Sequence, residues 1–224
     1  MIAVICAMDK ELKYFVDSLK EAKETLILNH KFIQGKINNK DVVIVKCGIG
    51  KMASGIVTTL LIEHYNPQVI INSGIAGGYS KELKPLDIIC VQNVGCYDID
   101  MRMDGTVYGT FKDEDRIIEL NTKLSNKLEY NVIYGTMMSS DYFASNRTKL
   151  DIIFSTHYND LKIDAVDMES YSVAYLCKKY NIECVIIRAI SDVVGMASQI
   201  SSYELFASNA AKCAFELILE NFIK

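Results

Sequence analysis

Proline and clusters of like charge are both scarce in this chain. Its 224 residues include two prolines, and no stretch has the composition of a linker, a repeat or a low-complexity segment. The net charge is −4 with mixed signs throughout, and the lack of a basic stripe argues against nucleic-acid binding. Half of the residues are hydrophobic, which is enough for one sizeable core. We therefore expect residues 1–224 to form a single domain.

The seven cysteines contain no C-x-x-C pair, and the three histidines lie far apart in the sequence. Neither set has the spacing of metal ligands, and a free thiol in an apolar run behaves as a small hydrophobic side chain. The N-terminus lacks the basic segment of a signal peptide, and no apolar run approaches the length of a membrane span. These absences predict a reduced, cytoplasmic protein without a metal, a cofactor or a membrane partner.

The segment 184–192, CVIIRAISD, contains a β-branched apolar run that predicts a strand buried on both faces. Asp192 stands at its end, and ligands of open α/β sheets bind beyond the carboxyl ends of the strands. A partly desolvated carboxylate at that place has a raised pKa and can donate a proton near neutral pH. Alternatively, Asp192 caps the next helix or pairs with Arg188.

Residues 2–7 form a short apolar run that we expect to be the first strand, and Asp9 can cap the helix after it. The apolar positions of that helix have helical spacing: Leu12, Phe15, Val16 and Leu19. Glu11 lies four residues before Phe15, so it falls on the apolar stripe. The helix dipole stabilises an acid in the first turn by less than about 1 kcal/mol. It does not explain why this acid points at the core. We therefore favour a functional carboxylate at Glu11.

Two glycine-rich loops follow predicted strands. Gly48-Ile49-Gly50 precedes a helix expected at 52–65 and imitates the G-x-G-x-x-A fingerprint of dinucleotide-binding folds. The ribose-binding acid expected about 20 residues later has no good candidate, so the safer interpretation is a backbone approach to a ligand at the helix N-terminus. Residues 72–78, NSGIAGG, follow the strand expected at 69–71 and let the backbone approach something flat or bulky.

Strands and helices alternate along the rest of the chain. The remaining strands are expected at 25–33, 41–45, 88–94, 132–138 and 163–166. The remaining helices are expected at 113–128, 147–154, 167–180 and 202–222. This alternation predicts an α/β fold in which a mixed, mainly parallel sheet carries helices on both faces. Glu11, Glu169 and Asp192 would then converge in one crevice and shift each other's pKa values, which suits acid–base chemistry.

Five motifs occur in order along the chain: CAMDKE, KCGIGKMAS, NSGIAGG, VDMES and RAISD. Together they resemble the 5′-methylthioadenosine/S-adenosylhomocysteine nucleosidases of the purine nucleoside phosphorylase superfamily, over essentially the whole chain. The resemblance implies a three-layer α/β/α sandwich, nucleoside phosphorylase-like, and a homodimer. It also implies hydrolysis of the N-glycosidic bond of both nucleosides, which releases adenine and a 5′-thioribose product for methionine salvage.

The resemblance also assigns roles to residues of this chain. Glu11 would activate water, and Asp192, assisted by Ser191, would protonate the adenine. Met168 and Glu169 would hold the ribose. Such a division of labour suits the reaction, because an oxocarbenium-like transition state needs an acid at the leaving base and a base for water.

The family's other substrate-binding positions correspond to Met8, Ile49, Ala76, Gly77, Met101, Phe143 and Ala144. Phe143 would stack on the purine, and the backbone at Ala144 would read its edge. Residues 97–109 would form a flap at the dimer interface, from which Met101 would reach into the partner's pocket. Methionines among charges also fit a flap or a subunit contact better than a core element.

The chain departs from the family at three positions around the 5′ substituent. Ile75 stands where a small hydroxyl residue is expected, Asp104 replaces an apolar residue of the flap, and Ser202 stands where an aromatic side chain closes the pocket. These changes predict a looser and more polar enclosure, which leaves the preference among 5′-substituted adenosines open.

The nearest rival function is a phosphate-dependent nucleoside phosphorylase. Phosphate needs fixed cations, most often arginine, yet none of the four arginines precedes residue 102, and Lys51 is the only obvious cation near a glycine loop. Hydrolysis is therefore favoured. A nucleoside-binding protein without activity is a second alternative, although all three acids are present. A dinucleotide-dependent oxidoreductase would depend on the glycine fingerprint alone.

Overall fold

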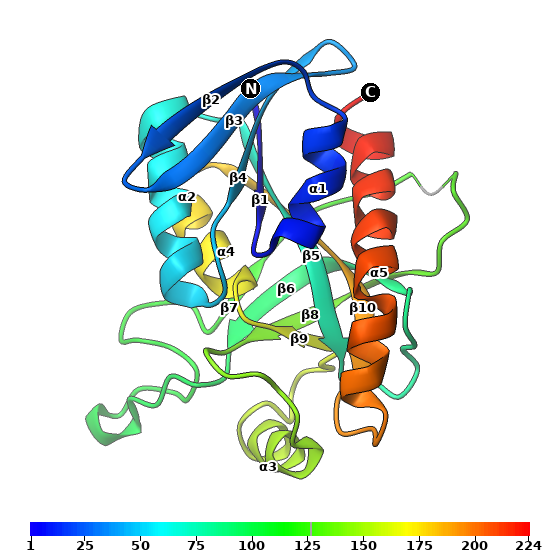
Figure 1. Cartoon of the computed structure of the whole chain (residues 1–224). Coiled ribbons are helices and arrows are strands. Elements are labelled where there is room, and N and C mark those ends of the chain that lie inside the picture. Colours follow the sequence, from blue (N-terminus) through cyan, green and yellow to red (C-terminus); the bar gives the residue numbers. More distant parts are fainter. Residues whose placement is uncertain (126) are drawn as a thin grey trace.

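The computed structural model describes residues 1–125 and 127–224 (Figure 1). The strands are β1 (Ile2–Cys6), β2 (Lys20–Ile27), β3 (His30–Ile37), β4 (Lys40–Lys46), β5 (Val69–Gly78), β6 (Ile88–Cys96), β7 (Ile117–Glu119), β8 (Val132–Ser139), β9 (Ala165–Asp167) and β10 (Glu183–Val193). The helices are α1 (Asp9–Asp17), α2 (Lys51–Tyr65), α3 (Arg147–His157), α4 (Ser170–Lys179) and α5 (Gln199–Phe222), with a 3₁₀ turn at Arg102–Asp104.

One mixed sheet contains all of these strands. Its parallel centre runs β4-β1-β5-β10, and these strands are rich in buried valine and isoleucine because helices cover both of their faces. β10 also pairs with β6, and β9 joins β8 to β5, so that β5, β10, β6, β8 and β9 close into a ring. The closed ring brings the carboxyl ends of β5 and β10 close to β9 and to the segment that follows β8.

Helices lie on both sides of the sheet, as Figure 1 shows. α1 and α5 cover one face, where Phe15 and Phe215 meet edge to face with ring centroids 4.9 Å apart. α2 and α4 cover the opposite face and pack through Val57, Leu61 and Val173. The expected α/β fold, in which a mixed sheet carries helices on both faces, is confirmed.

Four sequence-based expectations about individual elements were wrong. The segment 72–78 is not a loop, because β5 continues through it to Gly78 and pairs with β10 and β9. Of the helix expected at 113–128, residue 126 lies outside the described residues and the others are not helical, because Ile117 and Ile118 instead add the edge strand β7 to β6, which buries Ile118. The single strand expected at 25–33 is a hairpin of β2 and β3. The cap of α1 is Met8 rather than Asp9, which already lies inside the helix.

Among the described residues, no helix is long and apolar enough to cross a membrane. In the same part of the chain, no group of three or more histidine, cysteine, aspartate or glutamate side chains could hold a metal ion.

Candidate active site

A pocket opens at the carboxyl ends of the parallel strands. The segment between β1 and α1 and the first turn of α1 contribute Ala7, Met8 and Glu11 to its lining. The two glycine-rich segments contribute Ile49, Ile75, Ala76 and Gly77. The segment after β8 contributes Tyr142, Phe143 and Ala144. The remaining lining residues are Val166, Asp167, Met168, Glu169, Ser191, Asp192, Gln199 and Tyr203. Every substrate-binding or catalytic position expected from the sequence therefore lines this pocket, except Met101.

Glu11 is fully buried and is held by backbone N–H groups on both oxygens. Ala7 N and Met8 N donate to Oε2, each at 2.9 Å, and Ile75 N donates to Oε1 at 3.0 Å. Burial raises the pKa of this carboxyl, and the positive charge of Arg188 and the three N–H donors oppose that rise. A carboxylate accepts about four hydrogen bonds, so one acceptor position remains on Oε1.

Asp192 lies near the end of β10, just after a bulge against β5. Ser191 Oγ lies 2.6 Å from Asp192 Oδ1 and 3.3 Å from the carbonyl oxygen of Ala76. Gln199 Nε2 donates to Asp192 Oδ2 at 2.8 Å. Burial raises the pKa of Asp192, and the hydrogen bonds from Ser191 and Gln199 moderate that rise. The alternatives of a helix cap or a pair with Arg188 do not describe Asp192, since its partners are these two side chains.

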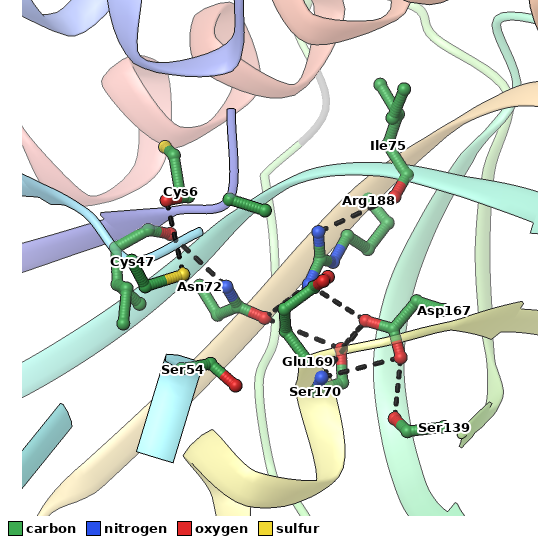
Figure 2. Close-up of polar contacts among 12 residues, drawn as sticks. Cys6, Cys47, Ser54, Asn72, Ile75, Ser139, Asp167, Glu169, Ser170 and Arg188 are labelled. Atoms are coloured by element: carbon green, nitrogen blue, oxygen red, sulfur yellow. Dashed lines mark hydrogen bonds and ion pairs between the residues drawn. The ribbon is translucent and has the colours of Figure 1, made fainter. Parts of the chain in front are cut away.

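Arg188 is fully buried. Its side chain lies beside those of Asp167 and Glu169, as Figure 2 shows. Its Nη2 lies 2.8 Å from Asp167 Oδ2 and 3.3 Å from Glu169 Oε2, and it donates to Asn72 Oδ1 at 2.7 Å. Gly74 makes this arrangement possible, because a side chain there would overlap both Arg188 Nη1 and Glu11 Oε1. The Arg188 guanidinium thus forms ion pairs with the carboxylates of Asp167 and Glu169. The carboxylate of Glu11 also lies close enough to interact with it electrostatically.

Glu169 precedes α4 and is held from the opposite side by the first glycine loop. Gly50 N donates to Glu169 Oε1 at 3.0 Å. Burial raises the pKa of Glu169 to about 7, because desolvation outweighs the attraction of Arg188 and is reinforced by the negative charge of Asp167. The glycine loop therefore positions an acid, not the phosphate of a dinucleotide.

Phe143 and Tyr203 form the outer wall of the pocket. Phe143 is half exposed, and its ring meets that of Tyr203 edge to face at 6.2 Å between centroids. The Tyr203 hydroxyl lies 3.5 Å from Met8 Sδ, and Lys10 Nζ lies 4.1 Å from the Tyr203 ring centroid. The expectation that Ser202 leaves this wall without an aromatic side chain was wrong, since α5 presents the next residue, Tyr203, to the pocket.

Met101 and Asp104 lie outside the pocket of their own chain. Met101 precedes the 3₁₀ turn at 102–104 and is 40% exposed, and Met103 is fully exposed. Among the described residues that line the pocket, none belongs to the segment 97–109.

Lys51, the cation expected near the first glycine loop, is already engaged. Its ammonium pairs with Asp98 and donates to Cys96 Sγ at 3.2 Å, and Asp141 Oδ2 lies 3.7 Å away. Burial opposes its charge, but these contacts raise the pKa of Lys51 overall. Lys51 does not line the pocket.

Sequence reasoning missed five polar or aromatic residues of the site. They are Tyr142, Asp167, Arg188, Gln199 and Tyr203. Arg188 had a visible signal, because an arginine inside a β-branched strand must find buried acids. Asp167 is its partner and precedes the Met168-Glu169 pair. Gln199 and Tyr203 gave no signal, because their placement depends on how the loop after β10 turns.

The family model of the phosphorylase superfamily matches residues 1–224. The 5′-methylthioadenosine/S-adenosylhomocysteine nucleosidase of Oceanobacillus iheyensis is 33% identical over 100% of this chain and 98% of its own length. The solved nucleosidase of the same description from Neisseria meningitidis, in complex with methylthio-immucillin-A, has a TM-score of 0.91 at 25% identity and covers 98% and 96% of the two chains. That from Colwellia psychrerythraea, in complex with adenine, has a TM-score of 0.90 at 26% identity and covers 98% and 93%.

Proposed function

The chain belongs to the phosphorylase superfamily and, within it, to the 5′-methylthioadenosine/S-adenosylhomocysteine nucleosidases, and from this premise we propose how its pocket works. It is an N-glycosyl hydrolase that releases adenine from these two nucleosides. The observation that carries the mechanism is the placement of buried acids around one pocket. Asp192 lies at one side of it, and Glu11 and Glu169 lie around Arg188 at the other.

Asp192 is the acid that protonates the leaving adenine. Adenine leaves far more easily as a neutral base than as an anion, and N7 is an acceptor beside the 6-amino group. Burial favours the neutral form of Asp192, which its raised pKa reflects. The Ser191 hydroxyl suits both protonation states, because it can donate to a carboxylate or can donate to Ala76 O and accept from a carboxylic acid.

Glu11 is the base that activates water. Its three backbone donors fix the carboxylate, and the remaining acceptor position on Oε1 is available to a water proton. Arg188 keeps positive charge close to Glu11, which favours the ionised form against the cost of burial.

Glu169 and Met168 hold the ribose. A carboxylate beside the ring grips hydroxyl groups and stabilises the positive charge that develops at the anomeric carbon. Gly50 N and Arg188 hold the Glu169 side chain from two sides, so it is fixed before the substrate arrives. Phe143 stacks on the purine, the backbone of Ala144 reads its edge, and Ala76 and Gly77 let the base approach β5.

Water, not phosphate, is the nucleophile. Lys51 is paired with Asp98, and Arg188 is surrounded by Asp167, Glu169 and Asn72. Neither cation among these described residues is free to bind a phosphate dianion. The acids that surround Arg188 would repel one as well.

A panel of nucleosides tests the proposed function. We expect free base from 5′-methylthioadenosine and S-adenosylhomocysteine, slower release from adenosine because Tyr203 encloses an alkylthio group, and almost none from inosine. Inosine presents a carbonyl at the position of the 6-amino group, where it would face the acceptors Ala144 O and Asp192. Rates are followed by absorbance of the released base. Preferential cleavage of inosine would contradict the assignment of the base site.

We further propose that the active species is a homodimer in the cytoplasm, with residues 97–109 at a twofold interface and Met101 against the partner's pocket. Met101 is exposed and absent from its own pocket, and exposed methionines need apolar cover. All seven cysteines are free thiols, which suits a reducing compartment.

Light scattering at micromolar concentration should give twice the mass of the chain. A fully active monomer would contradict the proposed interface, and recovery in a periplasmic or secreted fraction would contradict the compartment.

Residues 1–224 are proposed to act as one nucleosidase domain, because strands from Ile2 to Val193 belong to one sheet. A single cooperative unfolding transition is the expected result, and two separated transitions would contradict it.

A further inference from the structure

The side chain of Gln199 occupies the base end of the pocket. It is the first residue of α5 and is 5% exposed, whereas the four residues before it, 195–198, are all exposed. Its Nε2 donates to Ala144 O at 2.9 Å and to Asp192 Oδ2 at 2.8 Å. Its Oε1 accepts from Gly195 N at 2.9 Å.

These three partners fix which end of the carboxamide is the amine. Gly195 N is a donor and needs an oxygen opposite it, whereas Ala144 O is an acceptor and needs an N–H group. The NH₂ group of Gln199 therefore points its two protons at one backbone carbonyl and one carboxyl oxygen. This is a specific pattern of one amine with two acceptors.

The same two acceptors are the ones that the proposed function assigns to the base, so the inference depends on that function. Adenine carries an exocyclic amine with two N–H groups beside N7. A carboxyl group that protonates N7 through one oxygen has its other oxygen next to this amine. Ala144 O, in the segment that reads the edge of the purine, would accept the second N–H.

We propose that the carboxamide of Gln199 takes the place of the 6-amino group of adenine in the free enzyme and must leave when the base binds. The two N–H groups of the base amine then replace the two N–H groups of Gln199, so that neither Ala144 O nor Asp192 loses its hydrogen bond. A base without the amine would displace Gln199 and leave Ala144 O and Asp192 unsatisfied, which costs free energy. Gln199 thereby competes with the 6-amino group of the base for these two acceptors.

The surroundings of Gln199 favour such an exchange. Residues 195–198 are all exposed, so little of the loop before Gln199 is buried. Gly195 has a φ of +80°, which a glycine adopts without strain.

The test is the affinity for adenine, measured by titration calorimetry on the wild type, Gln199→Ala and a loop control, Met196→Ala. Met196 lies in the same exposed loop, and its side chain is 58% exposed. We expect adenine to bind Gln199→Ala about three to ten times more tightly than wild type, the scale of one competing hydrogen bond, with Met196→Ala unchanged. Equal or weaker binding to Gln199→Ala would overturn the proposal and make Gln199 part of the recognition surface.

A crystal structure of the wild-type enzyme with adenine decides the matter even where Gln199→Ala does not fold. We expect the base amine within hydrogen-bond distance of Ala144 O and Asp192, with the Gln199 carboxamide displaced. Gln199 still donating to both acceptors would overturn the proposal. The proposed function fails differently, through a wild type that releases no adenine from either thionucleoside.

Discussion

Asp192→Asn lowers kcat for adenine release from 5′-methylthioadenosine by at least about two to three orders of magnitude, the scale of a lost general acid. The amide keeps the shape of the side chain and can still accept from Ser191 or from Gln199, but it has no acidic proton for N7. Binding should therefore survive. The measurement is kcat and KM from the absorbance change on base release.

A matched control for this variant is Asp164→Asn. Asp164 is also buried and accepts a hydrogen bond from Thr136 N at 3.0 Å, but it does not line the pocket. Its substitution should lower the melting temperature and leave kcat within a few fold. If Asp192→Asn behaved like Asp164→Asn, Asp192 would be a structural residue and the acid would lie elsewhere.

The pH profile adds a second readout for the same variant. In the proposed mechanism Asp192 acts in its protonated form, so we expect activity in the wild type to fall as pH rises through its raised pKa. In the same mechanism Glu11 acts in its ionised form, so we expect activity to fall as pH drops through the raised pKa of that group. The wild-type profile is therefore bell-shaped, and Asp192→Asn should lose the alkaline limb while keeping the acid one.

Glu11→Gln abolishes most of the hydrolysis as well, by about two to four orders of magnitude in kcat. The amide cannot take a proton from water. Its NH₂ group must also face at least one of the backbone donors Ala7 N, Met8 N and Ile75 N, so a hydrogen bond is lost. The expected result is a large loss of kcat with a smaller fall in melting temperature, and with substrate binding retained.

Asp9→Asn separates the two explanations for an acid in this helix turn. Asp9 also lies in the first turn of α1, but it is exposed and pairs with Lys46 at 2.8 Å. If the helix dipole were the reason for Glu11, the two variants would differ little. Normal turnover in Glu11→Gln, with a shifted melting temperature alone, would support the dipole and remove Glu11 from the mechanism.

The positions of Glu11 and Asp192 were predictable because each departs from a strong local pattern, whereas the role of Glu169 was implied by the resemblance of the VDMES motif. Glu11 interrupts an apolar helix stripe, and Asp192 ends an apolar strand. The strands of the sheet centre were predictable for the same reason, since valine and isoleucine runs of that length have few alternatives. The helix expected at 113–128 failed because its apolar periodicity is weak, and pairing with β6 buries Ile118 and Leu120 instead.

The partners of the acids were not predictable from local pattern. Arg188 meets Asp167 and Glu169 only because β9 and β10 are brought together through β5. Tyr203 reaches the pocket where Ser202 was expected because the turn at 195–198 sets the rotation of α5, and one residue changes the facing direction of a helix by about 100°. Contacts of this kind depend on tertiary geometry that no sequence window contains.

We propose that water attacks the sugar while Asp192 protonates the base, and the rate of adenine release as a function of phosphate concentration tests this reaction. We expect full activity in phosphate-free buffer, no increase on addition of phosphate, and 5-methylthioribose with a free reducing end as the sugar product. Release that begins only when phosphate is added, with 5-methylthioribose 1-phosphate as the product, would contradict it.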